Sequence, residues 1–254
     1  MLTPISFGTE IFVKSSERTI GFTSSRGNQL KWRQGDLFIK LDCLGYEGLA
    51  EAYVSKFLQY TNVKEYVKYT QCTIVEDDTT LGAGCYSGDF IRGDTEITFG
   101  QILDSNLASY AISYDDLRDM VLNDTGFDPK SYMDAVLCLD AITMNDDRHF
   151  NNFALLRNDK GVYRAAPIFD NGGALLSDLL TYPMRDSVEV CMNRVQAKPF
   201  STDFLNQLNF VTPICIEPAQ FFSDVKPSTE EEKRAIEVLH RRLKVTKDIA
   251  WQEW

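Results

Sequence analysis

The chain has 254 residues, of which 44% are hydrophobic and 25% charged, so it can bury a sizeable core. Its formal net charge of -11 argues against a nucleic-acid or anionic-membrane partner, because phosphate groups would be repelled. Six cysteines occur singly beside two histidines, which predicts neither a disulfide framework nor a structural zinc site. No signal peptide or long apolar run is present, so we expect a cytoplasmic protein.

The first part of the chain is predicted to form a small sheet. Residues 10–42 alternate short apolar runs with turn residues, which is typical of antiparallel strands joined by tight connections. Further strand-like segments follow at residues 70–76 and 81–91. Residues 1–92 are therefore predicted to form a strand-rich N-terminal lobe.

Four segments have the pattern expected of helices: residues 47–60, 113–122, 130–144 and 228–244. The first carries Leu49, Tyr53 and Phe57 at four-residue spacing, and the third is apolar nearly all round. The last begins with Ser228 and Glu231 in the pattern of a capping box.

These elements predict an α+β fold with two lobes. Residues 93–254 would form a helix-rich C-terminal lobe, joined to the first lobe by a hinge near residues 88–94. Clefts between lobes are common ligand sites, so we expect the binding cleft there. Residues 205–227 give no prediction beyond completing the helical lobe.

A polar segment lies between apolar flanks in I-T-M-N-D-D-R-H-F-N-N-F-A-L-L, residues 142–156. Burying so many polar groups is costly unless they are paired or used. Two apolar runs around residues 158–161 predict a hairpin behind this segment. With Arg157 opposite Val162, the hairpin would return Asp170 to the neighbourhood of Asp147 and Asn152.

This arrangement would place carboxylate and amide oxygens close together. Oxygen ligands from Asn152 and Asp170 suit a hard cation such as Mg²⁺, which binds phosphates alongside one or two protein groups. Asp147 could then accept a proton from an attacking hydroxyl. The alternative interpretation is structural: Asp147, His149 and Asn152 cap the preceding helix, and Asp170 begins an ordinary turn.

The motif D-R-H-x-x-N at residues 147–152, followed by Asp170, resembles the catalytic loop and metal-binding aspartate of HipA-like serine/threonine kinases. The same lettering recurs in phosphoinositide kinases. Phe38-Ile39-Lys40-Leu41 is similar to the strand that carries the nucleotide-binding lysine, and residues 23–28 lie where that family has its phosphate-covering loop. Residues 197–204 also resemble a segment of short bacterial relatives, so the resemblance spans roughly residues 18–205.

The resemblance implies a bilobal protein-kinase-like fold with an ATP cleft between the lobes. It implies that Asp147 is the catalytic base and that Asn152 and Asp170 bind Mg²⁺. Lys40 would hold the α- and β-phosphates of ATP and pair with Glu51.

Two further groups of residues take their roles from the same resemblance. His149 is expected to orient the catalytic loop, and Asp146 to stabilise it. In the phosphate-covering loop, Ser24, Ser25 and Gly27 would contact ATP, and one of the two serines is a candidate autophosphorylation site.

The sequence departs from the family pattern at two places. Asn151 stands where HipA-like loops often carry a lysine, and Arg148 or Lys198 could replace that positive charge. The chain also begins almost directly at the kinase-like strands, so the sequence does not support toxin activity or an antitoxin partner.

The favoured prediction is an ATP- and Mg²⁺-dependent protein serine/threonine kinase with an unknown phosphoacceptor. A small-molecule or lipid kinase on the same fold is the first alternative, because a fold does not set the acceptor. The second is a catalytically weak pseudokinase that serves as a nucleotide-binding interaction module. A hydrolytic metal site has least support, because the two histidines, His149 and His240, are far apart in the sequence.

Overall fold

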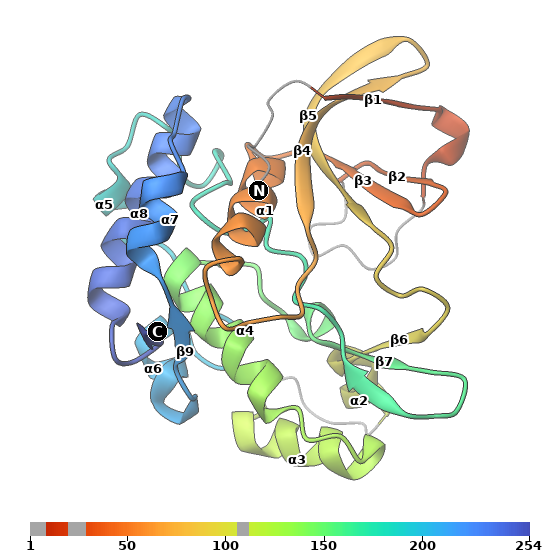
Figure 1. Cartoon of the computed structure of the whole chain (residues 1–254), viewed down its shortest axis with the longest axis vertical. Helices are drawn as coiled ribbons and strands as arrows, with labels where there is room; N and C mark the ends of the chain where they lie inside the picture. The colour runs from red at the N-terminus through yellow and green to blue at the C-terminus, as the bar shows by residue number, and fades with distance from the viewer. Residues whose placement is uncertain (1–8, 20–28, 106–111) are drawn as a thin grey trace.

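A curved five-stranded sheet forms the N-terminal part of the molecule, with strand order β1-β4-β5-β3-β2 (Figure 1). The computed structural model describes residues 9–19, 29–105 and 112–254. The sheet strands are β1 (Glu10–Val13), β2 (Lys31–Gln34), β3 (Leu37–Leu41), β4 (Tyr69–Glu76) and β5 (Thr79–Gly88). The predicted phosphate-covering loop with Ser24, Ser25 and Gly27 lies outside the described residues.

The predicted antiparallel pairing holds for four of these strands and is wrong for β1. Strand β2 pairs with β3, β3 with β5 and β4 with β5, all antiparallel. Strand β1 instead runs parallel to β4. A parallel partner needs a long connection, which here includes β2, β3 and α1.

Helix α1 (Glu47–Leu58) packs on the sheet, and the predicted apolar face is confirmed. Leu49, Tyr53 and Phe57 are all buried. The Glu47 carboxylate accepts hydrogen bonds from the backbone N–H groups of residues 43, 44 and 45, which fixes the approach from β3.

Helices dominate the rest of the chain: α2 (Phe99–Ser105), α3 (Tyr114–Thr125), α4 (Lys130–Thr143), α5 (Val188–Met192), α6 (Phe204–Gln207), α7 (Pro218–Asp224) and α8 (Glu230–Thr246). Short 3-10 turns are η1 (Ser15–Glu17), η2 (Phe150–Asn152) and η3 (Leu208–Phe210). The predicted cap of the last helix is wrong by one residue. Thr229 is the N-cap, and its capping box closes with Glu232, which also accepts from Ser228.

Two small sheets complete this part. Strands β6 (Thr95–Thr98), β7 (Ala154–Arg157) and β8 (Tyr163–Ala165) form an antiparallel sheet. Strands β9 (Ile214–Ile216) and β10 (Trp251–Glu253) pair in parallel. Residues 205–227, which gave no sequence prediction, thus contribute to α6, η3, β9 and α7.

The predicted hairpin exists, with a register that differs by one residue from the prediction. Arg157 pairs with Tyr163 and not with Val162. The difference arises in the turn, where the Asn158 side chain accepts from the N–H groups of residues 160 and 162 and the Asn158 N–H donates to the Val162 carbonyl. The connection from β5 to β6 covers residues 89–94, within the segment predicted as a hinge.

One large core cluster joins α1 to the helices of the C-terminal part. It includes Phe57 of α1, Leu137 of α4 and Leu239 of α8, all fully buried. Figure 1 shows α1 lying between the five-stranded sheet and the helices α7 and α8. A smaller core under the sheet contains Trp32 and Ile39. The larger core thus crosses the predicted boundary near residue 92.

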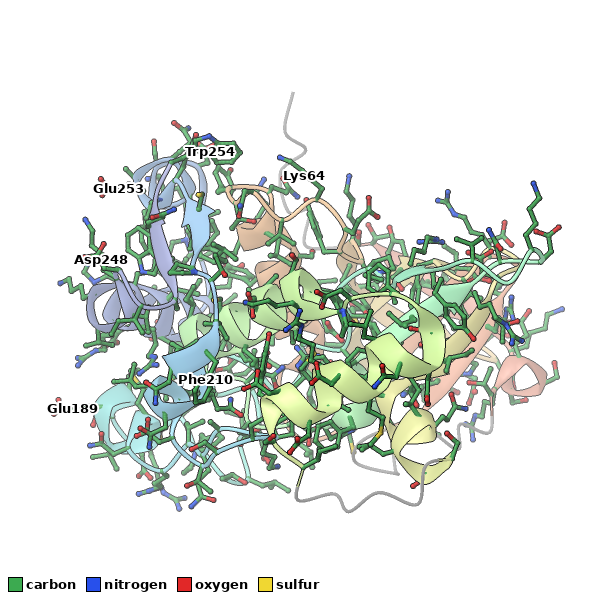
Figure 2. All side chains as sticks on the ribbon, turned by 90° about the horizontal axis from the view of Figure 1, so that it is seen from below. Lys64, Glu189, Phe210, Asp248, Glu253 and Trp254 are labelled. Carbon is green, nitrogen blue, oxygen red and sulfur yellow. The ribbon has the colours of Figure 1, made fainter. Side chains whose placement is uncertain are left out.

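The C-terminus is anchored against the segment that precedes β4. The Lys64 Nζ atom lies 5.2 Å from the ring centroid of Trp254, and Figure 2 shows both residues at one edge of the molecule.

No helix in the described ranges is long and apolar enough to cross a membrane.

Phe221 of α7 is expected to be a main contributor to the packing of α1. Its ring makes edge contacts with Phe57 at 5.2 Å and Tyr60 at 5.5 Å, and it is fully buried. Replacing Phe221 by Ala is expected to lower the free energy of unfolding by about 3–5 kcal/mol. Chemical denaturation measures this change.

The matched control is Phe210→Ala, because Phe210, labelled in Figure 2, is 61% exposed. That variant is expected to change the free energy of unfolding by about 0.5 kcal/mol or less. Equal effects of the two variants would contradict the role given to Phe221.

Candidate active site

The centre of the site is an ion-pair network around Lys40. Strand β3 alternates so that Ile39 packs into the core under the sheet while Lys40 faces the cleft. The Lys40 Nζ atom lies 3.0 Å from the Glu51 carboxylate and 2.9 Å from Asp170 Oδ1. Glu51 projects from α1 and is almost completely buried, and its second oxygen accepts from the Asn171 backbone N–H at 2.9 Å.

Asp170 and Asn152 meet as the hairpin argument predicted, despite the register difference. The Asn152 Nδ2 group donates to Asp170 Oδ2 at 2.7 Å. Asp170 has a positive φ of 57°, a left-handed conformation that aspartate tolerates better than most residues. Both carboxylate oxygens of Asp170 are thus hydrogen-bonded within the protein, one to Lys40 and one to Asn152.

Asp147 and Asp170 line the same cavity. The Asp147 backbone N–H donates to Asn145 Oδ1 at 3.1 Å, which fixes the turn after α4. A Cβ atom at Gly173 would lie 2.6 Å from the Asp147 Cβ, so only glycine fits at that position without displacing the aspartate. The neighbouring Asp146 accepts from the Tyr182 hydroxyl at 2.5 Å, consistent with a loop-stabilising role.

A cavity of about 130 Å³ unites these groups. Six of its lining residues carry the argument that follows: Lys31, Lys40, Glu51, Asp147, Asp170 and Gly173. They come from β2, β3, α1, the loop of residues 144–149 between α4 and η2, and the segment after β8. The fold therefore gathers both cations and acids from distant parts of the sequence in one place.

Burial and charge shift the pKa values of this network in a consistent pattern. Burial alone would lower the pKa of Lys40, but Asp170 and Glu51 outweigh it and raise that pKa well above its usual value. Burial raises the pKa of Glu51, against the opposing effect of Lys40. For Asp170, burial acts upward, and the ammonium groups of Lys40 and Lys31 reverse it and lower the pKa. Lys40 and Asp170 are therefore charged at neutral pH.

His149 takes part in the loop geometry. Its ring Nδ1 atom accepts from the backbone N–H of Asn151 at 3.2 Å, and its backbone N–H donates to Asn152 Oδ1 at 3.3 Å. Burial lowers the pKa of His149, so the neutral ring that can accept this bond is favoured. The side chain of Asn151 turns to the end of β6, where the Thr98 hydroxyl donates to its oxygen at 3.0 Å.

Arg148 does not supply the replacement cation suggested from the sequence. It is fully buried and forms two hydrogen bonds to Asp140 of α4, at 2.8 and 2.9 Å. It also donates to the Phe169 carbonyl at 3.0 Å and to Asn171 Oδ1 at 2.8 Å. Its positive charge is therefore compensated by the Asp140 carboxylate inside the protein and does not face the cavity. The other suggested cation, Lys198, is exposed.

Asp140, Asn171 and Lys31 are site residues that the sequence analysis missed. Asp140 could have been noticed, because it is a carboxylate in a helix that is otherwise apolar nearly all round. Lys31 and Asn171 gave no comparable signal. Ser24, Ser25 and Gly27 fall outside the described residues, so their predicted contact with ATP stays a prediction.

The donor chemistry fits the ligands that the sequence predicts. The Asn152 amide and the Asp170 carboxylate are neighbours, joined by a hydrogen bond from Asn152 Nδ2. Amide and carboxylate oxygens are ligands that suit Mg²⁺ bound jointly with phosphates. No cluster of three or more His, Cys, Asp or Glu side chains that could hold a metal occurs in the described part of the chain. The protein groups alone therefore do not form a closed metal cage.

Removal of Arg148 is expected to disrupt this site. Arg148→Met leaves Asp140 buried without its cation, so the free energy of unfolding is expected to fall by about 3–5 kcal/mol. The double variant with Asp140→Leu should recover part of the loss, because no buried charge remains. Urea denaturation measures both.

Arg118→Met is the control, since it removes an ion pair with Asp128 whose side chains are 30% and 45% exposed. Its expected cost is about 1 kcal/mol or less. A cost for Arg148→Met no larger than this would refute the structural role of the buried pair.

Several solved structures resemble this chain, and two of them are described here, whereas no protein-family model and no curated protein matches it. The Helicobacter pylori proinflammatory kinase CtkA has a TM-score of 0.67 at 15% identity, over 88% of this chain and 90% of that chain. HipA of Shewanella oneidensis MR-1, solved in a toxin–antitoxin complex with HipB and operator DNA, has a TM-score of 0.51 at 10% identity. That match covers 82% of this chain and 58% of HipA.

At these identities the likeness concerns the fold. It agrees with the resemblance to HipA-like kinases that the sequence shows at residues 147–152, Asp170 and the strand around Lys40. The chain has the bilobal α+β fold of the HipA-like kinases.

Proposed function

We propose that this protein is an ATP- and Mg²⁺-dependent phosphotransferase that acts on hydroxyl groups. The observation that carries the proposal is the convergence of Lys40, Asp147 and Asp170 on one cavity, with Asn152 bonded to Asp170. The HipA-like kinase fold supports it independently. Phosphoryl transfer depends mainly on positioning and charge compensation, which this set of groups can provide.

In this proposal the charged network receives the triphosphate of ATP. The Lys40 ammonium group would exchange Asp170 for phosphate oxygens as a partner and keep its ion pair with Glu51. Asn152 and Asp170 would hold Mg²⁺, which supplies charge neutralisation at the phosphates when bound. Release of Asp170 from Lys40 is favourable only if phosphate replaces it as the partner of the ammonium group.

Asp147 is the proposed base for the acceptor. It lines the cavity beside Asp170 and is held by the loop, so a hydroxyl entering from solvent can donate to its carboxylate. His149 and Arg148 would act through the loop: the backbone N–H of His149 is held by Asn152 Oδ1, and the Arg148 guanidinium group donates to the Phe169 carbonyl. A base in this position contributes typically 10²–10⁴-fold in rate.

A protein serine or threonine is the acceptor we favour, because of the resemblance to HipA-like serine/threonine kinases. A small-molecule or lipid hydroxyl is the alternative on the same fold. The net charge of -11 is unfavourable for an anionic membrane, which attracts basic clusters.

A catalytically weak pseudokinase is favoured by one observation, the engagement of both Asp170 oxygens by Lys40 and Asn152. If that arrangement persists with nucleotide, the protein binds ATP and transfers nothing. Labelled phosphate from ATP distinguishes the two, since only a kinase moves it to a protein or peptide acceptor.

Asp147→Asn is expected to reduce phosphate transfer by about 10²–10⁴-fold, because the amide cannot accept the proton. Its affinity for ATP should change little, since Asp147 is assigned to the acceptor. Radiolabelled ATP, with the protein itself and a serine/threonine peptide library as acceptors, measures transfer. Calorimetry measures binding.

The control is Asp159→Asn, which changes an exposed carboxylate in the hairpin turn and should leave transfer unchanged. Transfer that survives in Asp147→Asn at the wild-type rate would remove Asp147 from the mechanism. A wild-type protein that binds no ATP would refute the proposed function as a whole.

Lys40→Met is expected to have opposite effects on nucleotide and on free metal. ATP affinity should fall, because a phosphate partner is lost. Affinity for Mn²⁺ without nucleotide should rise by roughly tenfold, because Asp170 loses the ammonium group that competes for it. Isothermal calorimetry with Mn²⁺ measures the second effect.

Lys68→Met, at an exposed position just before β4, serves as the charge-matched control and should change neither affinity. Circular dichroism checks that both variants are folded. If Lys40→Met binds Mn²⁺ no better than wild type, Lys40 and a metal do not compete for Asp170.

A further inference from the structure

Lys31 lies beside Lys40 on the cavity face of the sheet. The two residues are directly opposite each other in the antiparallel pair of β2 and β3. Trp32 and Ile39, the next pair along the strands, are fully buried on the opposite face. Alternation therefore places both lysine side chains on the face that contains the cavity, and both line it.

This pairing is unfavourable for the folded protein by itself. Like charges directly opposite each other on a sheet repel. Lys40 is compensated by Glu51 and Asp170, whereas the Lys31 ammonium group makes no hydrogen bond or ion pair to any residue that the structure describes. Burial, and then Lys40, lower the pKa of Lys31, while Asp170, Glu51 and Cys85 act in the other direction from a distance.

The catalytic loop offers no cation for a phosphate group. Position 151 is an asparagine whose oxygen is bonded to Thr98, and a Cβ atom at Gly100 would lie 2.1 Å from that oxygen. Arg148 is buried in its bonds to Asp140 and Asn171. Among the residues that the structure describes, the positive charges that line the cavity are therefore Lys31 of β2 and Lys40 of β3.

We propose that Lys31 is a polyphosphate-binding residue that supplies the second positive charge to the triphosphate of ATP. The proposal rests on the proposed function and adds a residue that the sequence analysis did not select. An anion in the cavity would pair with the Lys31 ammonium group and remove its repulsion from Lys40. Lys31 would then contact phosphate oxygens while Lys40 remains tied to Glu51.

The test compares three ligands on the full chain by calorimetry in the presence of Mg²⁺: ATP, adenosine and inorganic tripolyphosphate. Loss of a charge-assisted hydrogen bond predicts that Lys31→Met binds ATP and tripolyphosphate about tenfold more weakly. Adenosine affinity should stay at the wild-type value, because Lys31 is assigned to the phosphates. Lys31→Arg should retain most of the affinity, since it keeps the charge.

Lys68→Met is again the control, because it removes one exposed positive charge from the same part of the chain. The inference is overturned if Lys31→Met binds tripolyphosphate as wild type does, or if it weakens adenosine and ATP by equal factors. The second outcome would indicate a structural role for the side chain.

The tripolyphosphate measurement separates this inference from the proposed function. Wild-type protein that binds tripolyphosphate through Lys31 but does not bind ATP would refute the nucleotide function and keep the anion site. ATP binding that is insensitive to Lys31→Met would keep the function and refute the inference. Absence of binding to either ligand would refute both.

Discussion

The buried ion pair between Arg148 and Asp140 is the constraint on which the candidate site depends. Both side chains are fully buried, so the pair is tolerated only because each hydrogen-bonding group finds a partner. The guanidinium group joins α4, through Asp140, to the carbonyl of Phe169 and the side chain of Asn171. One side chain therefore fixes the distance between the catalytic loop and the segment that carries Asp170.

A second set of bonds holds the same segment from the side of the sheet. Glu51 accepts from the backbone of Asn171, and Lys40 contacts Asp170. The dipeptide Asp170-Asn171 is thus held from two directions. Arg148 bonds to it from the helical part, and Glu51 of α1 and Lys40 of β3 bond to it from the side of the sheet. Because its position is set from both sides, the carboxylate of Asp170 can be placed accurately even though it lies in a loop.

Much of this arrangement followed from the sequence because local rules govern it. The apolar spacing of α1 and the hairpin behind the catalytic loop depend on neighbouring residues, and Asp170 returns to Asn152 even with the register displaced by one. The pairing of Asp140 with Arg148 could not be derived, because it requires knowing how a helix end faces a later turn. Parallel pairing of β1 with β4 was missed for the same reason, since it joins strands that are far apart in the sequence.

Helix α1 carries the partner of Lys40 on one face and part of the large core on the other. Tyr53 and Phe57 are buried in that core, where the ring of Phe221 from α7 packs edge-on against Phe57. In kinase-type sites the lysine–glutamate pair is controlled by the placement of this helix. Withdrawing Glu51 together with α1 would expose two aromatic side chains, at about 1.5–3 kcal/mol each, which is a large part of the stability of an ordinary domain. Movement of α1 is therefore costly, and we expect any switch in this molecule to act on the groups that enter the cleft and not on the helix behind it.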